Sequence, residues 1–315
     1  MYWSPVNPIR LLILIVSMAL CFACAPKEQK QSNKPLIVCT TGMIGDAVKN
    51  IVGVYAEVST IMGPGVDPHL YKATHGDLVK FQEADIVVYN GLHLEGKLGE
   101  VLKKVGAKRP IIAIAEKLDT ALLINNSAFQ GTYDPHIWFD VSLWNQALGY
   151  LTADLEKELN APEEAIRDMY SQYASKLDSL HASVKEQISR IPAQQRKLIT
   201  AHDAFAYFGR AYGIEVKGLQ GISTLSEFGL RDVSELVDFI AENKIPSIYT
   251  ETSVSEKSIE AVLVGVKARG VEVKLGGSLY SDAMGKNGTP EGTYIGMVEA
   301  NVQKIVAGLG ERVRD

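Results

Sequence analysis

The stretch "APEEAIRDMYSQYASKLDSLHASVKEQISRI", residues 161 to 191, decides how this chain is organised. Apart from Pro162 near its start, where proline is tolerated in a first turn, it contains neither proline nor glycine. Its apolar residues recur at spacings of three and four, the period of one helix face: Ile166, Met169, Tyr170, Tyr173, Leu177, Leu180, Val184 and Ile188. The pattern predicts one unbroken helix of about 28 residues, roughly 40 Å long at ~1.5 Å per residue.

On both sides of this predicted helix, short apolar runs alternate with helical patterns. The preceding part contains "PLIVCT", "MIGDAVKNIVG", "AEVSTIM", "GDLVKFQEA", "DIVVYN", "GKLGEVLKKV" and "RPIIAIA". The following part contains "RKLITA", "AFAYFGRAYG", "IEVKGL", "DVSELVDFIAENK", "PSIYTE", "EKSIEAVLVGVKARG" and "VEVKLG". Such alternation is typical of βαβ units around a parallel sheet. We therefore predict an α/β fold of two lobes, each a parallel β-sheet flanked by helices, joined by one long rigid helix.

The predicted domain organisation follows from these patterns. The N-terminal lobe covers residues 36–160, the connecting helix 161–191 and the C-terminal lobe 192–315. A length of 315 residues with 46% hydrophobic residues is enough for a large buried core. The net charge of -5, with no long basic run, gives no electrostatic footprint for nucleic acid. We expect a monomer that does not bind nucleic acid.

The N-terminal segment differs in kind from the rest of the chain. Arg10 precedes "LLILIVSMALCFACA", an uncharged apolar run that is too short to cross a hydrocarbon core of about 30 Å. It is typical of a secretory signal peptide, which we place at residues 1–23, followed by a flexible tether at 24–35. The folded part is therefore expected to be exported, on the periplasmic or cell-surface side of the cytoplasmic membrane.

The segment around Cys24 resembles a bacterial lipoprotein signal, because the hydrophilic tract "APKEQKQSNKP" follows this cysteine. The match to the lipobox is imperfect, since Cys21 stands where a leucine-like residue is usual. We predict a lipid anchor at Cys24 that tethers the protein to the membrane. After removal of the signal peptide, which contains Cys21, the single unmodified cysteine is Cys39. Its apolar run predicts a buried small hydrophobic residue and no disulfide framework.

Four polar residues follow predicted strands, where ligands bind in doubly wound sheets. They are His69, His136, His202 and Asp282, two from each lobe, so they could converge on the cleft between the lobes. Three imidazoles and one carboxylate suit a borderline divalent metal ion such as zinc. His69 and His136 both end an Asp-Pro-His triplet, in which proline stiffens the backbone before the histidine.

Each of these residues also has a structural interpretation. His69 and His136 could cap or pack against a loop, and Asp282, close to several glycines, could be a turn residue. Asp67 and Asp134, which begin the triplets, could accept a hydrogen bond from the histidine ring that binds metal. An N-cap or Asx-turn role for these two aspartates is equally compatible with the sequence.

Several motifs together resemble the TroA-type metal-binding solute-binding proteins of zinc and manganese ABC importers. They are, in the family's order, "TTGMIGDAVKNI", "MGPGVDPHLYKAT", "ADIVVYNGLHLEGKLGE", "DPHIWFD", "TAHDAFAYFGRAYG", "KGLQGISTLSE", "LYSDAMG" and "GTYIGMV". The resemblance runs from about residue 36 to the C-terminus. It implies two α/β lobes joined by one long helix, with metal in the interlobe cleft. Carried over by position, the family's ligands fall on His69, His136, His202 and Asp282.

The resemblance also implies a function. A non-catalytic receptor would capture the ion outside the cytoplasmic membrane and hand it to an ABC-transporter permease. Zn²⁺ is our first choice of ion, because a third imidazole at His202 is softer than the carboxylate of many manganese-preferring relatives. Mn²⁺ stays open, since the stretch "EKLDTALLINNSAFQGTY" lacks the histidine-rich loop of many zinc-specific relatives.

The other three histidines are expected to lie outside the metal site. We expect a structural role for His75 at a helix start and a solvated surface position for His181. His93 follows a strand, but the family motif contains it without using it as a ligand. Two other functions are alternatives to the receptor. A metal-dependent hydrolase would need three ligands, an activated water and a general base such as Glu251. A surface adhesin would be a binding protein of a different class.

Overall fold

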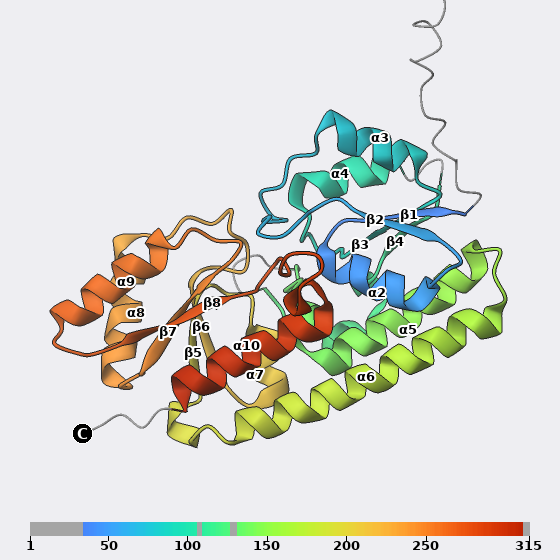
Figure 1. Cartoon of the computed structure of the whole chain (residues 1–315). Coiled ribbons are helices and arrows are strands. Elements are labelled where there is room, and N and C mark those ends of the chain that lie inside the picture. The colour runs from blue at the N-terminus through green and yellow to red at the C-terminus, as the bar shows by residue number, and fades with distance from the viewer. Residues whose placement is uncertain (1–33, 106–108, 127–130, 311–315) are drawn as a thin grey trace, which may run out of the picture. The chain divides into compact units, whose positions relative to one another are not determined.

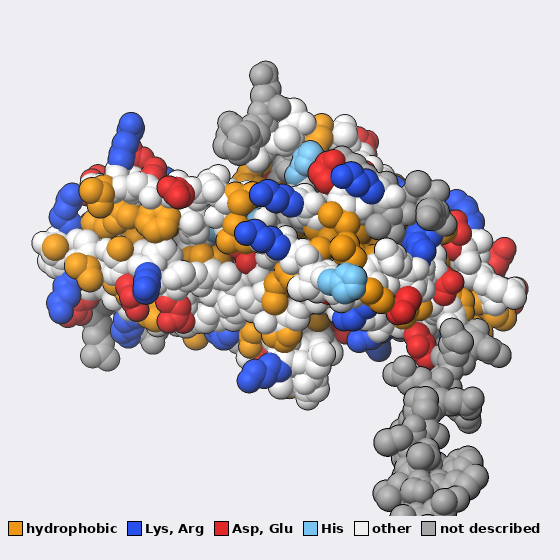
Figure 2. Space-filling view, turned by 90° about the horizontal axis from the view of Figure 1, so that it is seen from above, with side chains coloured by type: hydrophobic (Ala, Val, Ile, Leu, Met, Phe, Trp, Pro, Cys, Tyr) orange, Lys and Arg blue, Asp and Glu red, His pale blue; other side chains and the backbone are white. Residues whose placement is uncertain are grey.

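The computed structural model describes residues 34–105, 109–126 and 131–310. The predicted signal peptide, Cys24 and the tether up to residue 33 lie outside these ranges. Within them, no helix is both long enough and apolar enough to cross a membrane. On the face shown in Figure 2, acidic and basic side chains are interspersed with hydrophobic ones.

The first lobe is built around a parallel sheet of four strands in the order β2-β1-β3-β4. Its strands are β1 (Leu36–Cys39), β2 (Glu57–Thr60), β3 (Ile86–Tyr89) and β4 (Ile111–Ala113). Its helices are α2 (Gly42–Val52), α3 (His75–Glu83), α4 (Gly96–Val105) and α5 (Val141–Glu158). Three short 3-10 helices lie between β4 and α5, namely η1 (Ala115–Lys117), η2 (Thr120–Leu122) and η3 (Ile137–Phe139).

Strand β1 shows why this sheet is buried on both faces. Ile37 and Cys39 point into the core shared with α2 and α5, whereas Val38 points into a second core with Phe81 of α3 and Leu98 of α4. Successive residues of a strand face opposite sides, so a continuous apolar run is needed when helices cover both. The expectation that Cys39 is a buried hydrophobic residue is confirmed: it is fully buried, and burial raises the pKa of its thiol.

The second lobe contains two parallel strand pairs, β5 with β6 and β7 with β8, and β5 lies beside β7. The strands are β5 (Lys197–His202), β6 (Glu215–Gln220), β7 (Ser247–Glu251) and β8 (Lys274–Leu279). The helices are α7 (Ala206–Tyr212), α8 (Leu230–Glu242), α9 (Lys257–Ala268) and α10 (Tyr294–Leu309), with short 3-10 helices η4 (Ala193–Gln195) and η5 (Pro290–Gly292). The α/β fold with parallel sheets and two lobes is as predicted from the sequence.

Helix α6 (Glu163–Ser189) is a single helix of 27 residues. It packs against α2 and α5 of the first lobe and against α7 and α10 of the second, and Figure 1 shows it running beside both. The residues that it buries are Ile166, Tyr173, Leu177, Leu180, Val184 and Ile188, six of the eight in the predicted stripe. Burying one face along its length makes α6 a common support for the two lobes.

Buried aromatic side chains form hydrogen bonds between the two lobes. Trp138 of the first lobe donates its indole N–H to the carbonyl of Ser281, at 3.1 Å. The hydroxyl of Tyr294 donates to the carbonyl of Trp138 at 2.7 Å. The hydroxyl of Tyr207 donates to the carbonyl of Asp134 at 2.8 Å. These buried contacts connect the backbones that carry the predicted ligands of both lobes.

Candidate metal centre

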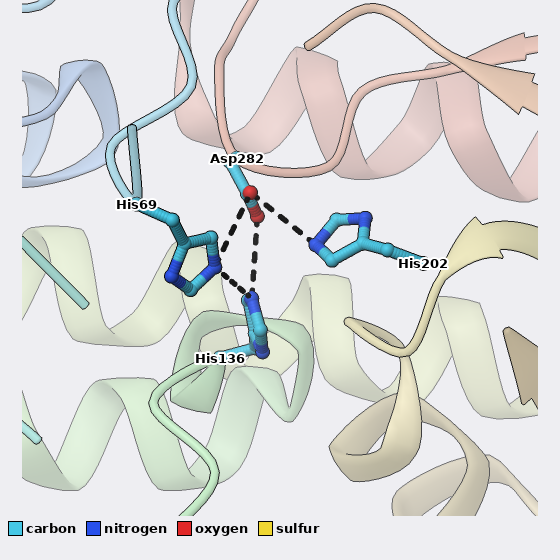
Figure 3. Close-up of side chains that lie close together, drawn as sticks. All are labelled: His69, His136, His202 and Asp282. Atoms are coloured by element: carbon cyan, nitrogen blue, oxygen red, sulfur yellow. Dashed lines mark hydrogen bonds and ion pairs between the residues drawn. The ribbon is translucent and has the colours of Figure 1, made fainter. Parts of the chain in front are cut away.

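The four side chains singled out in the sequence meet at one place between the lobes (Figure 3). His69 comes from the loop after β2, and His136 lies immediately before η3. His202 is the last residue of β5, and Asp282 lies in the loop after β8. His69, His202 and Asp282 therefore lie at or after the carboxyl ends of strands, and His136 lies in a loop beside them. This is the expected place for a ligand site in parallel sheets.

The potential ligand atoms lie close together. His69 Nε2 is 3.3 Å from His136 Nε2 and 3.7 Å from Asp282 Oδ2. Asp282 Oδ1 is 3.4 Å from His136 Nε2. Asp282 Oδ2 is also 3.3 Å from His202 Nε2. One ligand atom from each residue can be chosen so that all lie within 4.8 Å of one another.

Four of these separations are close to those of a tetrahedral site. Ligand atoms about 2.0 to 2.2 Å from a tetrahedral metal ion stand roughly 3.3 to 3.6 Å apart. The carboxylate of Asp282 lies near that distance from all three imidazoles, at 3.7, 3.4 and 3.3 Å. The contacts of Asp282 are therefore compatible with an ion shared by all four side chains, whose chosen ligand atoms are no more than 4.8 Å apart.

Burial makes this arrangement costly without a cation. His136 and His202 are 0% exposed, Asp282 2% and His69 4%. Among the described side chains, His202 Nε2 and both carboxylate oxygens of Asp282 are buried without a hydrogen-bond partner. Because buried polar atoms are normally satisfied, unpaired atoms that face a common point indicate a site built for an ion.

Asp134 orients the ring of His136. Its Oδ1 accepts the backbone N–H of His136 at 2.9 Å and lies 2.7 Å from Nδ1 of the ring. The aspartate therefore closes an Asx-turn and also contacts the ring, so the two roles left open by the sequence occur together. With Nδ1 occupied in this way, Nε2 faces Asp282 and His69.

Asp67 differs from its counterpart. Its Oδ1 accepts the backbone N–H of His69 at 2.8 Å, which forms the same turn. Its Oδ2 accepts a hydrogen bond from the hydroxyl of Thr224 at 2.6 Å. The two identical triplets thus use their aspartates differently, because the carboxylate of Asp67 is shared with the second lobe.

Glu251, the last residue of β7, holds His202. Its Oε1 accepts the backbone N–H of His202 at 2.9 Å, and its Oε2 lies 2.5 Å from Nδ1 of the ring. Both carboxylate oxygens are engaged with one residue, so Glu251 is an orienting group for an imidazole. The sequence had suggested this glutamate only as the general base of a hydrolase.

The electrostatics of the cluster set its protonation. Burial opposes charge on His136, but Asp134 and Asp282 raise its pKa to about 9. Burial also opposes charge on His202, yet Glu251 and Asp282 raise its pKa well above the ordinary value. Burial lowers the pKa of His69 to about 3. The pKa of Asp282 is held well below its usual value by His202 and His136, against the effect of burial. A bound cation would take the place of these protons.

A loop of the first lobe supports both histidine loops. The side chain of Asn90 donates to the carbonyl of Pro135 at 3.0 Å. Gly96 has a φ of +48°, and a Cβ there would come within 2.8 Å of the carbonyl oxygen of His69. Glu95, buried in the same loop, accepts from the hydroxyl of Thr40 at 2.8 Å and from the backbone of Asn90 at 2.6 Å. The segment Asn90–Gly96 therefore fixes the backbones beside His69 and His136.

The remaining histidines lie away from the cluster. His75 is exposed and begins α3, and His93 is exposed with a φ of +67°. The prediction for His181 as a solvated surface residue is wrong. It is half-buried, and its Nδ1 lies 3.2 Å from the hydroxyl of Tyr212, because α6 packs against α7 at this point.

The chain is similar to known metal-binding proteins. The family model of the zinc-uptake complex component A, periplasmic (ZnuA), matches residues 37–308. The chain is 47% identical over 283 residues to the zinc-binding protein TroA of Treponema pallidum (strain Nichols), covering 90% of this chain and 91% of that protein. It is 46% identical over 299 residues to the manganese-binding lipoprotein MntA of Bacillus subtilis (strain 168), covering 94% and 97%.

The fold is also that of a solved relative. The structure of the periplasmic zinc-binding protein TroA from Treponema pallidum superposes with a TM-score of 0.86 at 47% identity, covering 89% of this chain and all 100% of that chain. The names of these relatives describe metal-binding proteins and give no support to a hydrolase or an adhesin.

Proposed function

Because this chain belongs to the family of the periplasmic zinc-uptake complex component A, we propose that it is the extracytoplasmic metal receptor of an ABC transporter. It captures Zn²⁺, with Mn²⁺ as the second candidate, and delivers the ion to a membrane permease for uptake. The proposal is supported most directly by the convergence of three buried imidazoles and one buried carboxylate on a common point.

In this proposal the ligands are His69, His136, His202 and Asp282. Each imidazole presents Nε2 to the carboxylate, and two of the rings have a carboxylate beside Nδ1 that fixes their orientation. The ion arrives as substrate, displaces protons from the histidines and satisfies the unpaired oxygens of Asp282. Ligands from both lobes let the bound ion hold the lobes together.

The choice of ion rests on the chemistry of the donors. Imidazole nitrogen binds divalent zinc more tightly than divalent manganese at equal geometry. The two relatives at similar identity are named for different ions, zinc for TroA and manganese for MntA, so likeness alone does not separate them. The three-imidazole set therefore makes zinc the first candidate.

The receptor is proposed to be non-enzymatic. Four protein ligands complete a tetrahedral site, whereas catalytic zinc sites keep a position for water. Glu251 has both oxygens engaged with His202, which leaves it poorly placed as a general base. Binding followed by release to a partner is the activity that this arrangement supports.

The proposed cellular arrangement extends the sequence predictions. Residues 1–23 act as a signal peptide, Cys24 carries a lipid anchor and residues 24–35 tether a monomeric receptor to the outer side of the cytoplasmic membrane. The lobes comprise residues 36–160 and 192–315, with 161–191 as the connector. The name of MntA, a lipoprotein, supports the anchor.

Two measurements together test the function. The first is elemental analysis of the protein purified without added metal, and the second is a binding competition between zinc and manganese. We expect about one zinc ion per chain and displacement of manganese by zinc. Protein that binds neither ion would contradict the receptor, and manganese retained against zinc would reverse the choice of ion.

A further inference from the structure

A side-chain hydrogen bond joins the His69 loop of the first lobe to the second lobe. Thr224, between β6 and α8, donates its hydroxyl to Oδ2 of Asp67 at 2.6 Å. The other oxygen of Asp67 accepts the backbone N–H of His69 at 2.8 Å. A single carboxylate therefore connects the backbone of one ligand to a side chain of the opposite lobe.

The other Asp-Pro-His triplet shows what His69 lacks. Asp134 contacts both the backbone N–H and the ring Nδ1 of His136, so that ring is oriented within its own loop. Asp67 holds only the backbone of His69, and its second oxygen is committed to Thr224. The position of His69 therefore depends on a contact made by the second lobe.

The Thr224–Asp67 contact is partly buried and is flanked in sequence by exposed residues. His69 is 4% exposed, more than the other three ligands. The residues that follow the two partners in sequence are much more open, with Leu70 50% exposed and Leu225 60% exposed. A hydroxyl donating to a carboxylate forms a strong, charge-assisted hydrogen bond, and partial burial reduces competition from water.

We infer that Thr224 is a positioning residue for metal binding: through Asp67 it holds His69 against the ion, and loss of this interlobe hydrogen bond opens the site for release. The inference rests on the proposed function. It places the departure of the ion on the His69 side, where separation of the lobes first breaks the Thr224–Asp67 contact. His202 and Asp282 remain attached to the second lobe during this step.

Metal dissociation measured by stopped-flow mixing with an excess of a chromophoric chelator tests the inference. The full chain, kept in solution with detergent and loaded with Zn²⁺, is compared with Thr224→Val, which keeps the shape of the side chain but removes the donor. We expect zinc to dissociate about tenfold faster from Thr224→Val, with the association rate within about twofold of the original chain. An effect on dissociation alone distinguishes a closing contact from a general disturbance of the fold.

Two further variants complete the experiment. Thr224→Ser retains a hydroxyl and should restore dissociation to within about twofold of the original rate. Ser223→Ala removes a hydroxyl of the same segment that accepts from the backbone N–H of Leu225, and should leave the rate unchanged. Equal rates for Thr224→Val and the original chain, or equal acceleration by Ser223→Ala, would overturn the inference alone. Failure of the original chain to bind zinc would overturn the proposed function and the inference with it.

Discussion

Glu251 and His202 end two neighbouring strands, and the carboxylate of Glu251 contacts both the backbone N–H and the ring Nδ1 of His202, at 2.9 and 2.5 Å. Both side chains are fully buried. The pair fixes which ring nitrogen faces Asp282, so a residue that does not touch the ion is expected to control one of its ligands.

Substitution of Glu251 should therefore weaken metal binding. We expect Glu251→Gln to lower zinc affinity by about 10-fold to 100-fold, because the amide is a weaker partner for the imidazole and can present a donor to it. Calorimetric titration measures this effect. Glu256→Gln, at an exposed position near the start of α9, is the matched control and should bind as the original chain does. Unchanged affinity in Glu251→Gln would show that the contact does not orient His202.

Removal of a ligand should have a larger effect. His202→Ala is expected to lower zinc affinity by at least about 100-fold, since a tetrahedral ion loses one of its four ligands. The far-UV circular dichroism should not change, because the two strand pairs remain paired. His75→Ala removes an exposed imidazole at the start of α3 and should leave the affinity unchanged. If both variants bind equally well, His202 is not a ligand.

The affinity for metal should depend on pH. Without metal, Asp134 and Asp282 raise the pKa of His136 to about 9, and Glu251 and Asp282 raise that of His202. Metal binds neutral imidazole, so binding must release these protons, and affinity should rise with pH up to about 9. Calorimetry near pH 7.5 in buffers of different ionisation enthalpy should show release of at least about one proton. A buffer-independent enthalpy would contradict this protonation state.

Glu95 should make stability depend on pH without contacting the metal ligands. Burial raises its pKa from 4.5 to about 7. A carboxyl whose folded pKa is raised contributes stability that is present below the unfolded pKa and is lost as pH rises through the folded pKa. Between these values the loss is about 3 kcal/mol. The contribution of Glu95 to the free energy of unfolding of metal-free protein should therefore decrease from pH 4.5 to 7.

Glu95→Gln tests this expectation, because glutamine does not titrate. Denaturant unfolding of both proteins across this pH range should show that the original chain loses stability relative to the variant as pH rises, with the two curves differing in slope by about one proton. The same slope in both proteins would mean that Glu95 is ionised throughout and that its hydrogen bonds from Thr40, Asn90 and the backbone N–H of Gly91 outweigh burial.

The fold and the four clustered residues could be predicted because their signals are local. The stripe of α6 has helical period, and His202 and Asp282 follow apolar strand runs directly in the sequence. The contacts made by Glu251 and Thr224 could not be predicted in the same way. Each joins positions far apart in the chain, 49 residues for Glu251 and His202 and 157 for Thr224 and Asp67, with no pattern that links them.

Two other features show the limits of local patterns. The identical triplets gave no indication that Asp134 would orient a ring while Asp67 contacts the opposite lobe. His181, with polar neighbours in sequence, was expected on the surface, but its neighbour in space is Tyr212 of α7. In both cases tertiary packing decides what the side chain does.

Anomalous diffraction from crystals of zinc-loaded protein, with data on both sides of the zinc absorption edge, tests the central claim most directly. The account predicts one strong peak between the lobes, about 2.0 to 2.2 Å from Nε2 of His69, His136 and His202 and from a carboxylate oxygen of Asp282. A peak elsewhere, or one that excludes any of these residues from the coordination, would contradict the four-ligand site.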